Sequence, residues 1–489
     1  MIVVVVLVFV AVLALLAGAH WYVWRRLVRD TTQARGVARG VGTVALWVLP
    51  LLSFGALVAG RAGAPFWLER VVAWPGYLWL AVLLYLVLAL LVGEVVRAVW
   101  LRRSRGSQQP QQLRGAGASA APAPVDAPPS DQEPAVVTVP PSEPATESGT
   151  TTLASPGRTH PENATAATAA TAAASAATDT PSSVRGTGAG DTDTSADRAA
   201  THEVKPATTP DDPRTVSRRL FVSRVVGGGA AVAALGTVGH GAYGVLRGPK
   251  IKRVTVPLAK LPRSAHGFRI AVVSDIHLGP ILGRAHTQRI VDTINAASPD
   301  LVAVVGDMVD GSVADLGSAA EPLNQLQARH GSFFVTGNHE YFSGAEEWVD
   351  HVRELGLRPL ENERVEIAGF DLAGVDDIEG EKFGRGPDFR KALGDRDSAR
   401  AAVLLAHQPV VIHDAVEHGV DLQLSGHTHG GQLWPGNHLA ALANPTVAGL
   451  ERYGDTQLYV TRGAGAWGPP VRVGASSDIT VVQLASRQA

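Results

Sequence analysis

The sequence predicts a helical membrane region, then a disordered linker, then a C-terminal α/β domain. Three observations predict this order. Four long apolar segments lie within residues 1–250, residues 104–216 contain almost no large apolar side chain, and residues 251–489 alternate short apolar runs with amphipathic stretches. These features explain why the 489-residue chain is 46% hydrophobic but only 18% charged, which is unusual for a purely soluble protein.

Composition also excludes several classes of function. Nucleic-acid-binding proteins usually carry a basic domain, and the formal net charge of -2 gives no support for one. We therefore expect no nucleic-acid partner. The chain has no cysteine, which excludes disulfides, thiolate zinc sites, iron–sulfur clusters and cysteine nucleophiles. A metal site in this chain must therefore be built from His, Asp, Glu, Asn and water.

The first apolar segment, residues 2–24, carries no charge and is long enough to cross a bilayer as a helix. A signal peptide is the alternative, but no basic residues precede the segment and no small-residue cleavage pattern follows it. Two more apolar segments, residues 41–60 and 71–92, predict a second and a third transmembrane helix. We therefore predict a multi-pass membrane region over residues 1–103.

The distribution of arginines predicts how this region is oriented. Arginines cluster after the first and the third segment, at Arg25, Arg26, Arg29, Arg35 and Arg39 and at Arg97, Arg102, Arg103 and Arg105. The positive-inside rule places both clusters in the cytoplasm and the N-terminus outside.

Residues 104–216 contain no Phe, Trp, Tyr or Ile and consist mainly of Ala, Pro, Thr, Ser, Gly and Asp. Such a segment cannot bury enough apolar surface to offset the entropy of ordering it, so we predict a disordered linker.

A fourth apolar segment, residues 225–246, lies within residues 217–250 and follows Arg218 and Arg219. The pair of arginines resembles a twin-arginine export motif, which makes the twin-arginine translocation machinery an expected partner. An ordinary transmembrane helix with a basic cytoplasmic flank is the alternative, and both interpretations place residues 251–489 outside the cell membrane. The basic residues that follow the segment oppose this placement. If residues 225–246 instead form a buried helix of the last domain, that domain stays cytoplasmic.

Five apolar runs in the C-terminal domain end on Asp, Asn or His. The residues at these ends are Asp275 and His277, Asp307, Asn338 with His339 and Glu340, His407, and His427 with His429. In open α/β sheets, ligands bind at the carboxyl ends of strands. Taken alone, the Gly-Asp and Gly-Asn-His-Glu motifs also fit turns, and His407 fits an extended residue shortly before proline. Their occurrence together, in order and at strand ends, indicates one site.

Taken in order, these motifs resemble the calcineurin-like metallophosphoesterase superfamily, which carries Asp-X-His, Gly-Asp, Gly-Asn-His-Asp/Glu, a later His and Gly-His-X-His. The resemblance covers about residues 265–485 and implies two mixed β-sheets sandwiched between helices. The wording of residues 274–279 and 425–432 looks most like the bacterial membrane-associated phosphodiesterase branch, some members of which are exported by the twin-arginine route. Ser477-Asp478-Ile479 departs from the Pro-Glu-Ile that relatives often show, a difference that concerns the substrate side rather than the metals.

The resemblance implies a site for two divalent metal ions. Asp275, His277 and His429 would hold one metal, Asn338, His407 and His427 would hold the other, and Asp307 would bridge them. Mixed carboxylate, imidazole and amide ligands suit Mn, Fe or Zn. His339 resembles the family histidine that contacts the phosphate and protonates the leaving oxygen; a purely hydrogen-bonding role is the alternative.

The predicted function is hydrolysis of a phosphodiester or pyrophosphate by a water that two metals activate. The predicted location favours a lipid- or envelope-derived phosphoester as substrate. A soluble-nucleotide phosphomonoesterase and an inactive sensor or binding module on the same fold are the alternatives. A transporter or scaffold with an enzymatic appendage is not supported, because the apolar segments carry no pair of Asp, Lys or Arg and only Glu94 lies near the end of one.

Other polar features have structural interpretations. Residues 462–465 lack the Lys-Ser/Thr of a phosphate loop and predict a tight turn near the site. Asp376-Asp377 predicts a solvated turn, with cation binding as the alternative. We expect surface or loop positions for the histidines that match no ligand position, which are His266, His286, His330, His351, His413, His418 and His438.

Overall fold

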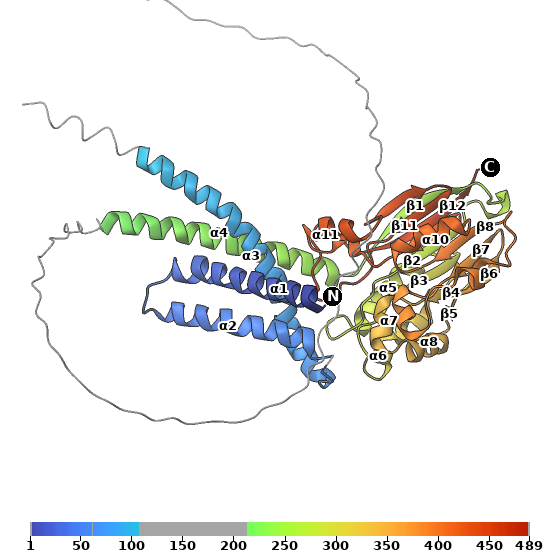
Figure 1. Cartoon of the computed structure of the whole chain (residues 1–489), viewed down its shortest axis with the longest axis horizontal. Coiled ribbons are helices and arrows are strands. Elements are labelled where there is room, and N and C mark those ends of the chain that lie inside the picture. Colours follow the sequence, from blue (N-terminus) through green and yellow to red (C-terminus); the bar gives the residue numbers. More distant parts are fainter. Residues whose placement is uncertain (1, 61, 107–212, 488–489) are drawn as a thin grey trace, which may run out of the picture. The chain divides into compact units, whose positions relative to one another are not determined.

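A computed structural model describes residues 2–60, 62–106 and 213–487. The predicted linker, residues 104–216, lies almost wholly outside these described residues. The model places a group of long helices before a domain of strands and short helices (Figure 1).

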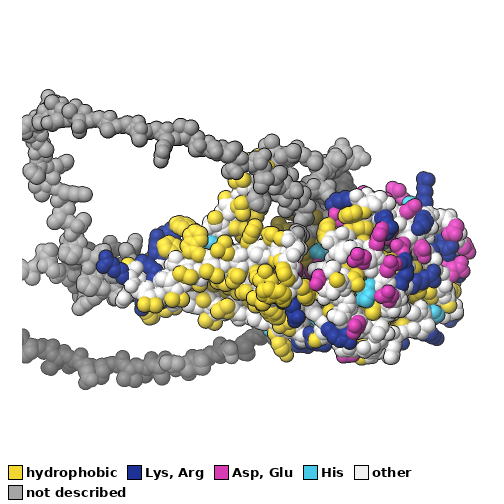
Figure 2. All heavy atoms as spheres, turned by 90° about the horizontal axis from the view of Figure 1, so that it is seen from below, with side chains coloured by type: hydrophobic (Ala, Val, Ile, Leu, Met, Phe, Trp, Pro, Cys, Tyr) yellow, Lys and Arg dark blue, Asp and Glu magenta, His cyan; other side chains and the backbone are white. Residues whose placement is uncertain are grey.

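The long helices coincide with the apolar segments of the sequence. They are α1 (Ile2–Val23), α2 (Val37–Val58), α3 (Phe66–Gly106) and α4 (Pro213–Leu246). A π-helical turn, Trp24–Arg29, follows α1. Within the described part of the chain, three stretches are long and apolar enough to cross a membrane, namely α2, Phe66–Arg103 of α3 and Leu220–Leu246 of α4. Hydrophobic side chains gather over the helices and charged side chains over the C-terminal domain (Figure 2).

Small residues let these helices approach closely. A Cβ added to Gly76 of α3 would lie 2.5 Å from the carbonyl oxygen of Leu52 in α2. The Ser53 hydroxyl, also in α2, donates a hydrogen bond of 2.8 Å to the Gly76 carbonyl. Between α3 and α4, a Cβ on Gly93 would lie 2.6 Å from Val226. Close backbone contact of this kind is typical of helices packed within a bilayer, where van der Waals packing drives association.

The C-terminal domain contains two six-stranded sheets. The first has the strand order β1-β12-β2-β3-β4-β5 and the second the order β10-β11-β9-β8-β7-β6. The strands of the first sheet are β1 (Lys250–Leu258), β2 (Arg269–Val273), β3 (Leu301–Val305), β4 (Ser332–Val335), β5 (Arg358–Pro359) and β12 (Asp478–Ser486). Those of the second are β6 (Glu363–Ile367), β7 (Phe370–Gly374), β8 (Ala401–Leu405), β9 (Leu422–Ser425), β10 (Gly449–Tyr453) and β11 (Thr456–Val460).

Both sheets are mixed. In the first, β12 pairs antiparallel with β2, whereas β2, β3 and β4 run parallel. In the second, β7, β8 and β9 run parallel and β6 and β10 add antiparallel edges. The central strands β3 and β8 are apolar along their whole length because both of their faces are buried.

Short helices connect the strands, and some of them cover the outer faces of the two sheets. They are α5 (Arg284–Ala297), α6 (Val313–Ala320), α7 (Asn338–Ser343), α8 (Ala345–Glu354), α9 (Phe389–Leu393), α10 (Ile412–Glu417) and α11 (Gly436–Ala443). Val272 and Val403 belong to the core between the sheets. Ile290 of α5 packs on the first sheet and Ile412 of α10 on the second. The predicted fold, two mixed sheets flanked by helices, is confirmed.

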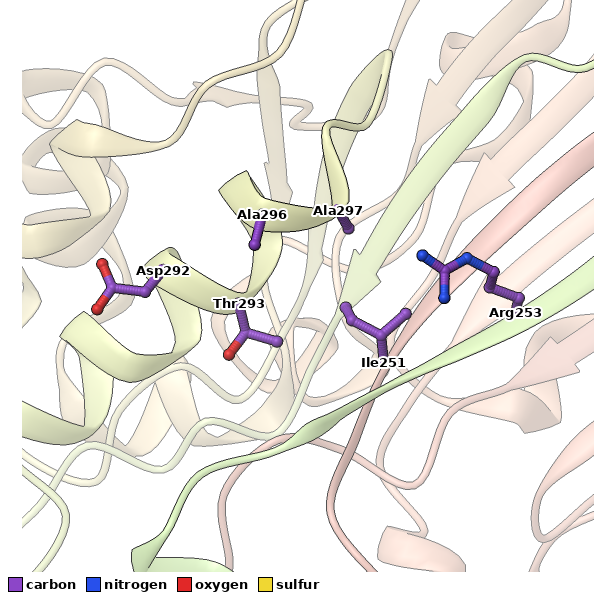
Figure 3. A pocket seen from close by; sticks show the side chains of 6 residues that line it. All are labelled: Ile251, Arg253, Asp292, Thr293, Ala296 and Ala297. Atoms are coloured by element: carbon purple, nitrogen blue, oxygen red, sulfur yellow. The ribbon is translucent and has the colours of Figure 1, made fainter.

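A shallow hollow lies between β1 and α5 (Figure 3). Its volume is about 400 Å³, and it is lined by Ile251, Arg253, Asp292, Thr293, Ala296 and Ala297. None of the predicted metal ligands lines it. The polar residues that follow β2, β3, β4, β8 and β9 lie together elsewhere, in the centre described next.

Candidate metal centre

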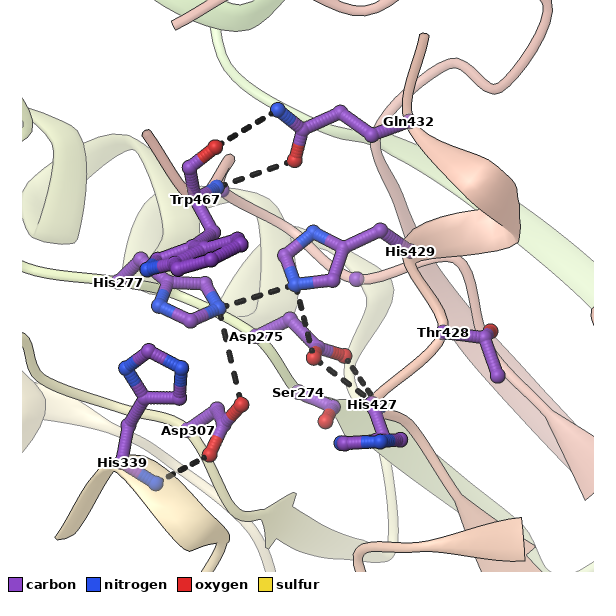
Figure 4. A network of polar contacts seen from close by, with 12 residues as sticks. Ser274, Asp275, His277, Asp307, His339, His427, Thr428, His429, Gln432 and Trp467 are labelled. Atoms are coloured by element: carbon purple, nitrogen blue, oxygen red, sulfur yellow. Dashed lines mark hydrogen bonds and ion pairs between the residues drawn. The ribbon is translucent and has the colours of Figure 1, made fainter. Parts of the chain in front are cut away.

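The first group of predicted ligands comes together after β2 and β9. Nε2 of His277 and Nε2 of His429 lie 3.0 Å apart, and His429 Nε2 lies 3.3 Å from an Asp275 carboxylate oxygen (Figure 4). All three side chains are buried. Two buried imidazole nitrogens that face each other beside a carboxylate are a donor set that fits a shared cation.

The second group comes together after β3, β4, β8 and β9. Nε2 of His407 lies 3.1 Å from an Asp307 carboxylate oxygen and makes no hydrogen bond to any described residue. The other ring nitrogen of His407 donates to the Val305 carbonyl oxygen at 2.9 Å, so in the neutral imidazole Nε2 keeps its lone pair. His427 Nδ1 lies 3.0 Å from Asn338 Oδ1. An orphaned, buried imidazole nitrogen beside a carboxylate fits a metal ligand, so the residues of this group suit a cation as well.

Asp307 lies between the two groups. Its Oδ2 is 3.1 Å from His407 Nε2 and 3.8 Å from His277 Nε2. The structure thus brings all seven predicted ligands into one centre, with Asp307 in the central position.

The backbone at this centre is strained. Among the described residues, eight non-glycine residues have positive φ, and five of them are predicted ligands. These five are Asp275 (52°), His277 (50°), Asp307 (52°), His427 (73°) and His429 (53°). Left-handed backbone is unfavourable for such residues and gathers at functional sites, where the fold turns side chains toward a common point.

Two glycines allow the close packing around the carboxylates. A Cβ on Gly337 would lie 2.3 Å from Asp307 Oδ1, and a Cβ on Gly463 would lie 2.5 Å from Asp275 Cβ. Gly463 also has φ of 81°. The Gly-rich segment predicted as a turn near the site thus contacts a predicted ligand directly.

Glu340, to which the sequence analysis gave no role, supports Asp307. Its buried carboxylate accepts backbone N–H groups from Asp307 (2.9 Å), Met308 (2.7 Å) and Gly337 (2.6 Å). Burial, together with the nearby charge of Asp307, raises the pKa of Glu340 to about 7. The spacing Gly-X-X-Glu at the start of α7, which allows a side chain to reach back to the first turn, is the signal that could have found it.

Asp310 was also missed by the sequence analysis. One of its carboxylate oxygens lies 2.9 Å from His277 Nδ1 and 2.6 Å from His339 Nδ1. Burial alone would lower the pKa of His339, but the carboxylates of Asp307 and Asp310 outweigh burial and raise this pKa to about 9. The same two histidines hold the pKa of Asp310 below its usual range although burial opposes the shift. Its position three residues after Asp307, on the same loop, was the available signal.

Arg472 is a buried cation next to His429. Its guanidinium donates to the backbone carbonyls of His429 (3.0 Å), Gly465 (2.6 Å) and Ala475 (3.2 Å). Burial lowers the pKa of Arg472 to about 10, so the side chain stays charged at neutral pH. Nothing in the local sequence distinguishes this arginine from a surface residue.

Two expectations from the sequence are wrong. His286 is not a surface residue, because α5 turns it inward; it is 1% exposed and neither ring nitrogen has a hydrogen-bond partner among the described residues. Burial, helped by Arg289 and Arg472, lowers its pKa to about 3. Asp377 is not in a solvated turn, since it is buried and accepts 2.8 Å hydrogen bonds from the Glu379 N–H and the Gln408 side chain. Burial raises the pKa of Asp377 to about 6.

Comparison with known proteins agrees with this centre. Residues 268–431 match the family described as calcineurin-like phosphoesterase. A transmembrane protein with metallophosphoesterase domain from Danio rerio is 41% identical over 259 residues, which cover 50% of this chain and 59% of that protein. Because the relatives include this eukaryotic protein, they do not single out the bacterial twin-arginine branch, which stays a prediction.

Two bacterial relatives cover a larger share of their own length. An uncharacterized metallophosphoesterase from Helicobacter pylori strain J99 is 40% identical over 271 residues, 55% of this chain and 72% of that protein. Another from Aquifex aeolicus is 34% identical over 240 residues, 48% of this chain and 91% of that protein. The chain therefore belongs to the calcineurin-like metallophosphoesterase family.

Proposed function

We propose that this protein is a membrane-anchored phosphoesterase that uses two divalent cations to hydrolyse a phosphodiester or pyrophosphate bond. The observation that carries the proposal is the pair of donor groups, Asp275 with His277 and His429 and Asp307 with His407 and His427. Within each group the ligand atoms lie within 4.8 Å of one another.

In this proposal Asp275, His277 and His429 bind one cation. Asn338, His407 and His427 bind the other, and Asp307 bridges the two. Imidazole, carboxylate and amide oxygen together suit Mn, Fe or Zn. Two bound cations would supply an activated water and neutralise the charge of the phosphate oxygens.

His339 is the residue placed to handle a proton. Its ring is held by Asp310 at 2.6 Å, and its backbone N–H donates to Asp307 at 2.9 Å. The rings of Phe342 and Trp467 lie 5.6 and 5.7 Å from it. A side chain fixed in this way can deliver a proton to the oxygen of the leaving group.

The test uses the full chain purified in detergent, with bis-p-nitrophenyl phosphate as substrate and Mn²⁺ added after chelation. We expect metal-dependent hydrolysis that Asp307→Ala or His427→Ala abolishes, whereas the matched controls Asp292→Ala and His413→Ala keep it. Hydrolysis that survives Asp307→Ala or His427→Ala contradicts the two-metal assignment. Metal binding without hydrolysis supports the inactive-module alternative, and faster cleavage of p-nitrophenyl phosphate supports the phosphomonoesterase alternative.

The proposed location of the phosphoesterase domain is outside the cell membrane. Arg26 pairs with Glu94 of α3 at 2.5 Å, and Arg224 of α4 donates to the Thr31 carbonyl at 3.0 Å. The arginine-rich loop after α1 therefore lies against the late part of α3 and the early part of α4, whereas the domain follows the end of α4. The positive-inside rule supports a cytoplasmic position for the arginine-rich side and an opposite position for the domain.

The absence of cysteine makes this topology easy to test. We expect a membrane-impermeant maleimide to label Asp455→Cys on intact cells but not Gln33→Cys. The reverse pattern would place the domain in the cytoplasm. If the twin-arginine machinery exports the domain, labelling of Asp455→Cys is lost when Arg218 and Arg219 are both replaced by lysine.

A further inference from the structure

An uncharged, exposed helix lies next to the metal centre. α11 carries no charged side chain and none of its residues is buried. Leu439 is 72% exposed, Leu442 is 84% exposed, and Trp434, two residues before the helix, is 51% exposed. A contiguous group of large apolar side chains on a surface marks a contact with a partner or a membrane.

The loop before α11 is packed against the long helices. The carbonyl oxygen of Trp434 accepts a hydrogen bond of 2.9 Å from the Tyr85 hydroxyl of α3. Leu433 and Val473 pack against a cluster that includes Tyr85 and Val238. α3 and α4 are two of the three described helices that are long and apolar enough to cross a membrane, so the loop before α11 adjoins helices that fit a bilayer.

The same loop is also joined to the metal centre. His429 lies three residues before Gln432, whose side chain donates to the Trp467 carbonyl at 2.8 Å and accepts the Trp467 N–H at 3.0 Å (Figure 4). The Trp467 ring, 50% exposed, lies 5.7 Å from the ring of His339. Gln432 thus joins the loop before α11 to Trp467, whose ring lies beside the residue proposed to protonate the leaving group.

We propose that Trp434, Leu439, Leu442 and Trp467, here called the apolar platform, insert into the bilayer surface, and that the substrate is a membrane amphiphile whose phosphoester head group enters the metal centre. The substrate part rests on the proposed phosphoesterase function. The insertion part does not, because it depends only on exposure and on contact with the long helices.

A bilayer fits the platform better than a protein partner does. Tryptophan is enriched at the level of lipid head groups, where its ring contacts apolar chains and its N–H reaches water. The platform also adjoins helices that fit a membrane, so a bilayer that holds α3 and α4 already lies next to it.

Insertion is tested without catalysis. In the full chain, which has no cysteine of its own, Leu442→Cys is labelled with an environment-sensitive fluorophore and reconstituted in phosphatidylcholine vesicles. Val410→Cys, at a position that is 41% exposed outside the platform, is the control. We expect blue-shifted emission and quenching by doxyl-labelled lipid for Leu442→Cys only. Equal behaviour of the two positions overturns insertion, and so does a blue shift without quenching, which would indicate a protein partner.

The substrate class is tested with lipid pairs that share a head group. Phosphatidylglycerol is compared with glycerophosphoglycerol, and farnesyl pyrophosphate with dimethylallyl pyrophosphate, at equal concentration in the same vesicles. We expect the lipid of at least one pair to be cleaved at least about tenfold faster than its short analogue, because the platform draws long chains to the site. Equal rates within both pairs overturn the substrate class.

A double variant links the platform to this preference. Leu439→Gln with Leu442→Gln is expected to lose about tenfold in lipid cleavage while its rate on bis-p-nitrophenyl phosphate stays unchanged, and Val410→Gln is expected to change neither. A double variant that keeps the lipid preference overturns the role of the platform. Failure of the wild type to cleave any phosphoester, with quenching at Leu442→Cys intact, would instead count against the proposed function alone.

Discussion

A carboxylate oxygen of Asp310 lies 2.9 Å from Nδ1 of His277, whose Nε2 faces His429 across 3.0 Å. When one nitrogen of an imidazole is hydrogen-bonded to a carboxylate, the tautomer and orientation of the ring are set. The other nitrogen then becomes a stronger ligand for a metal. The first donor group of the centre therefore depends on a residue outside it.

Asp310→Asn should weaken Mn²⁺ binding or activity by about 10- to 100-fold, the usual effect of losing such a supporting carboxylate. Titration of the chelated protein with Mn²⁺, followed by calorimetry and by hydrolysis rate, checks this. Asp292→Asn removes a surface carboxylate on α5 and serves as the control. Wild-type affinity and rate in Asp310→Asn would show that the contact is structural only.

His339→Gln tests proton delivery. We expect a loss of about 100-fold or more on a diester with an alkyl leaving group, because the leaving oxygen then needs a proton. The loss should be much smaller on bis-p-nitrophenyl phosphate, whose leaving group departs as a stable anion. Rates on the two substrates measure the difference, and His413→Gln is the control. An equal loss on both substrates would assign His339 to phosphate binding.

Glu340→Gln should destabilise the loop that carries Asp307. The wild-type carboxylate accepts three backbone N–H groups, but the amide has one oxygen and would turn its NH₂ toward a donor. A buried donor left without a partner costs about 1–3 kcal/mol. Thermal unfolding in detergent and the metal content per chain report the effect. Glu346→Gln, which removes an exposed carboxylate paired with Arg385, is expected to leave both near wild type.

His286 predicts an acid-sensitive fold. The pKa of His286 is about 3 in the folded chain and 6.5 in the unfolded chain, so between these pH values the unfolded chain takes up a proton that the folded chain does not. The stability contributed by the neutral ring is complete above pH 6.5 and is lost as the pH falls. The loss at pH 5 is about 2 kcal/mol.

His286→Leu removes this proton uptake. The decrease in melting temperature between pH 7.5 and pH 5 should therefore be smaller in His286→Leu than in the wild type. His413→Leu, at an exposed position, should melt as the wild type does at both pH values. An unchanged acid dependence in His286→Leu would contradict the burial argument.

The sequence by itself determined the order of the elements and the identity of the predicted ligands. Apolar runs mark the long helices and the central strands because burial requires apolar side chains on every face that water does not reach. Polar residues directly after such runs indicate a site because parallel strands bring their carboxyl ends to one edge. That reasoning placed Asp275, Asp307 and His427 in one centre without coordinates.

Only the tertiary structure decided which side chains support that centre. Asp310, Glu340 and Arg472 act through contacts to residues that lie up to 43 positions away in the chain, and such contacts leave no periodic pattern in the sequence. The inward position of His286 depends on the rotation of α5 against the sheet, and the exposure of Leu439 and Leu442 depends on where α11 sits. Local sequence records the preferences of each segment, whereas burial and charge partners are decided by the segments that the fold brings beside it.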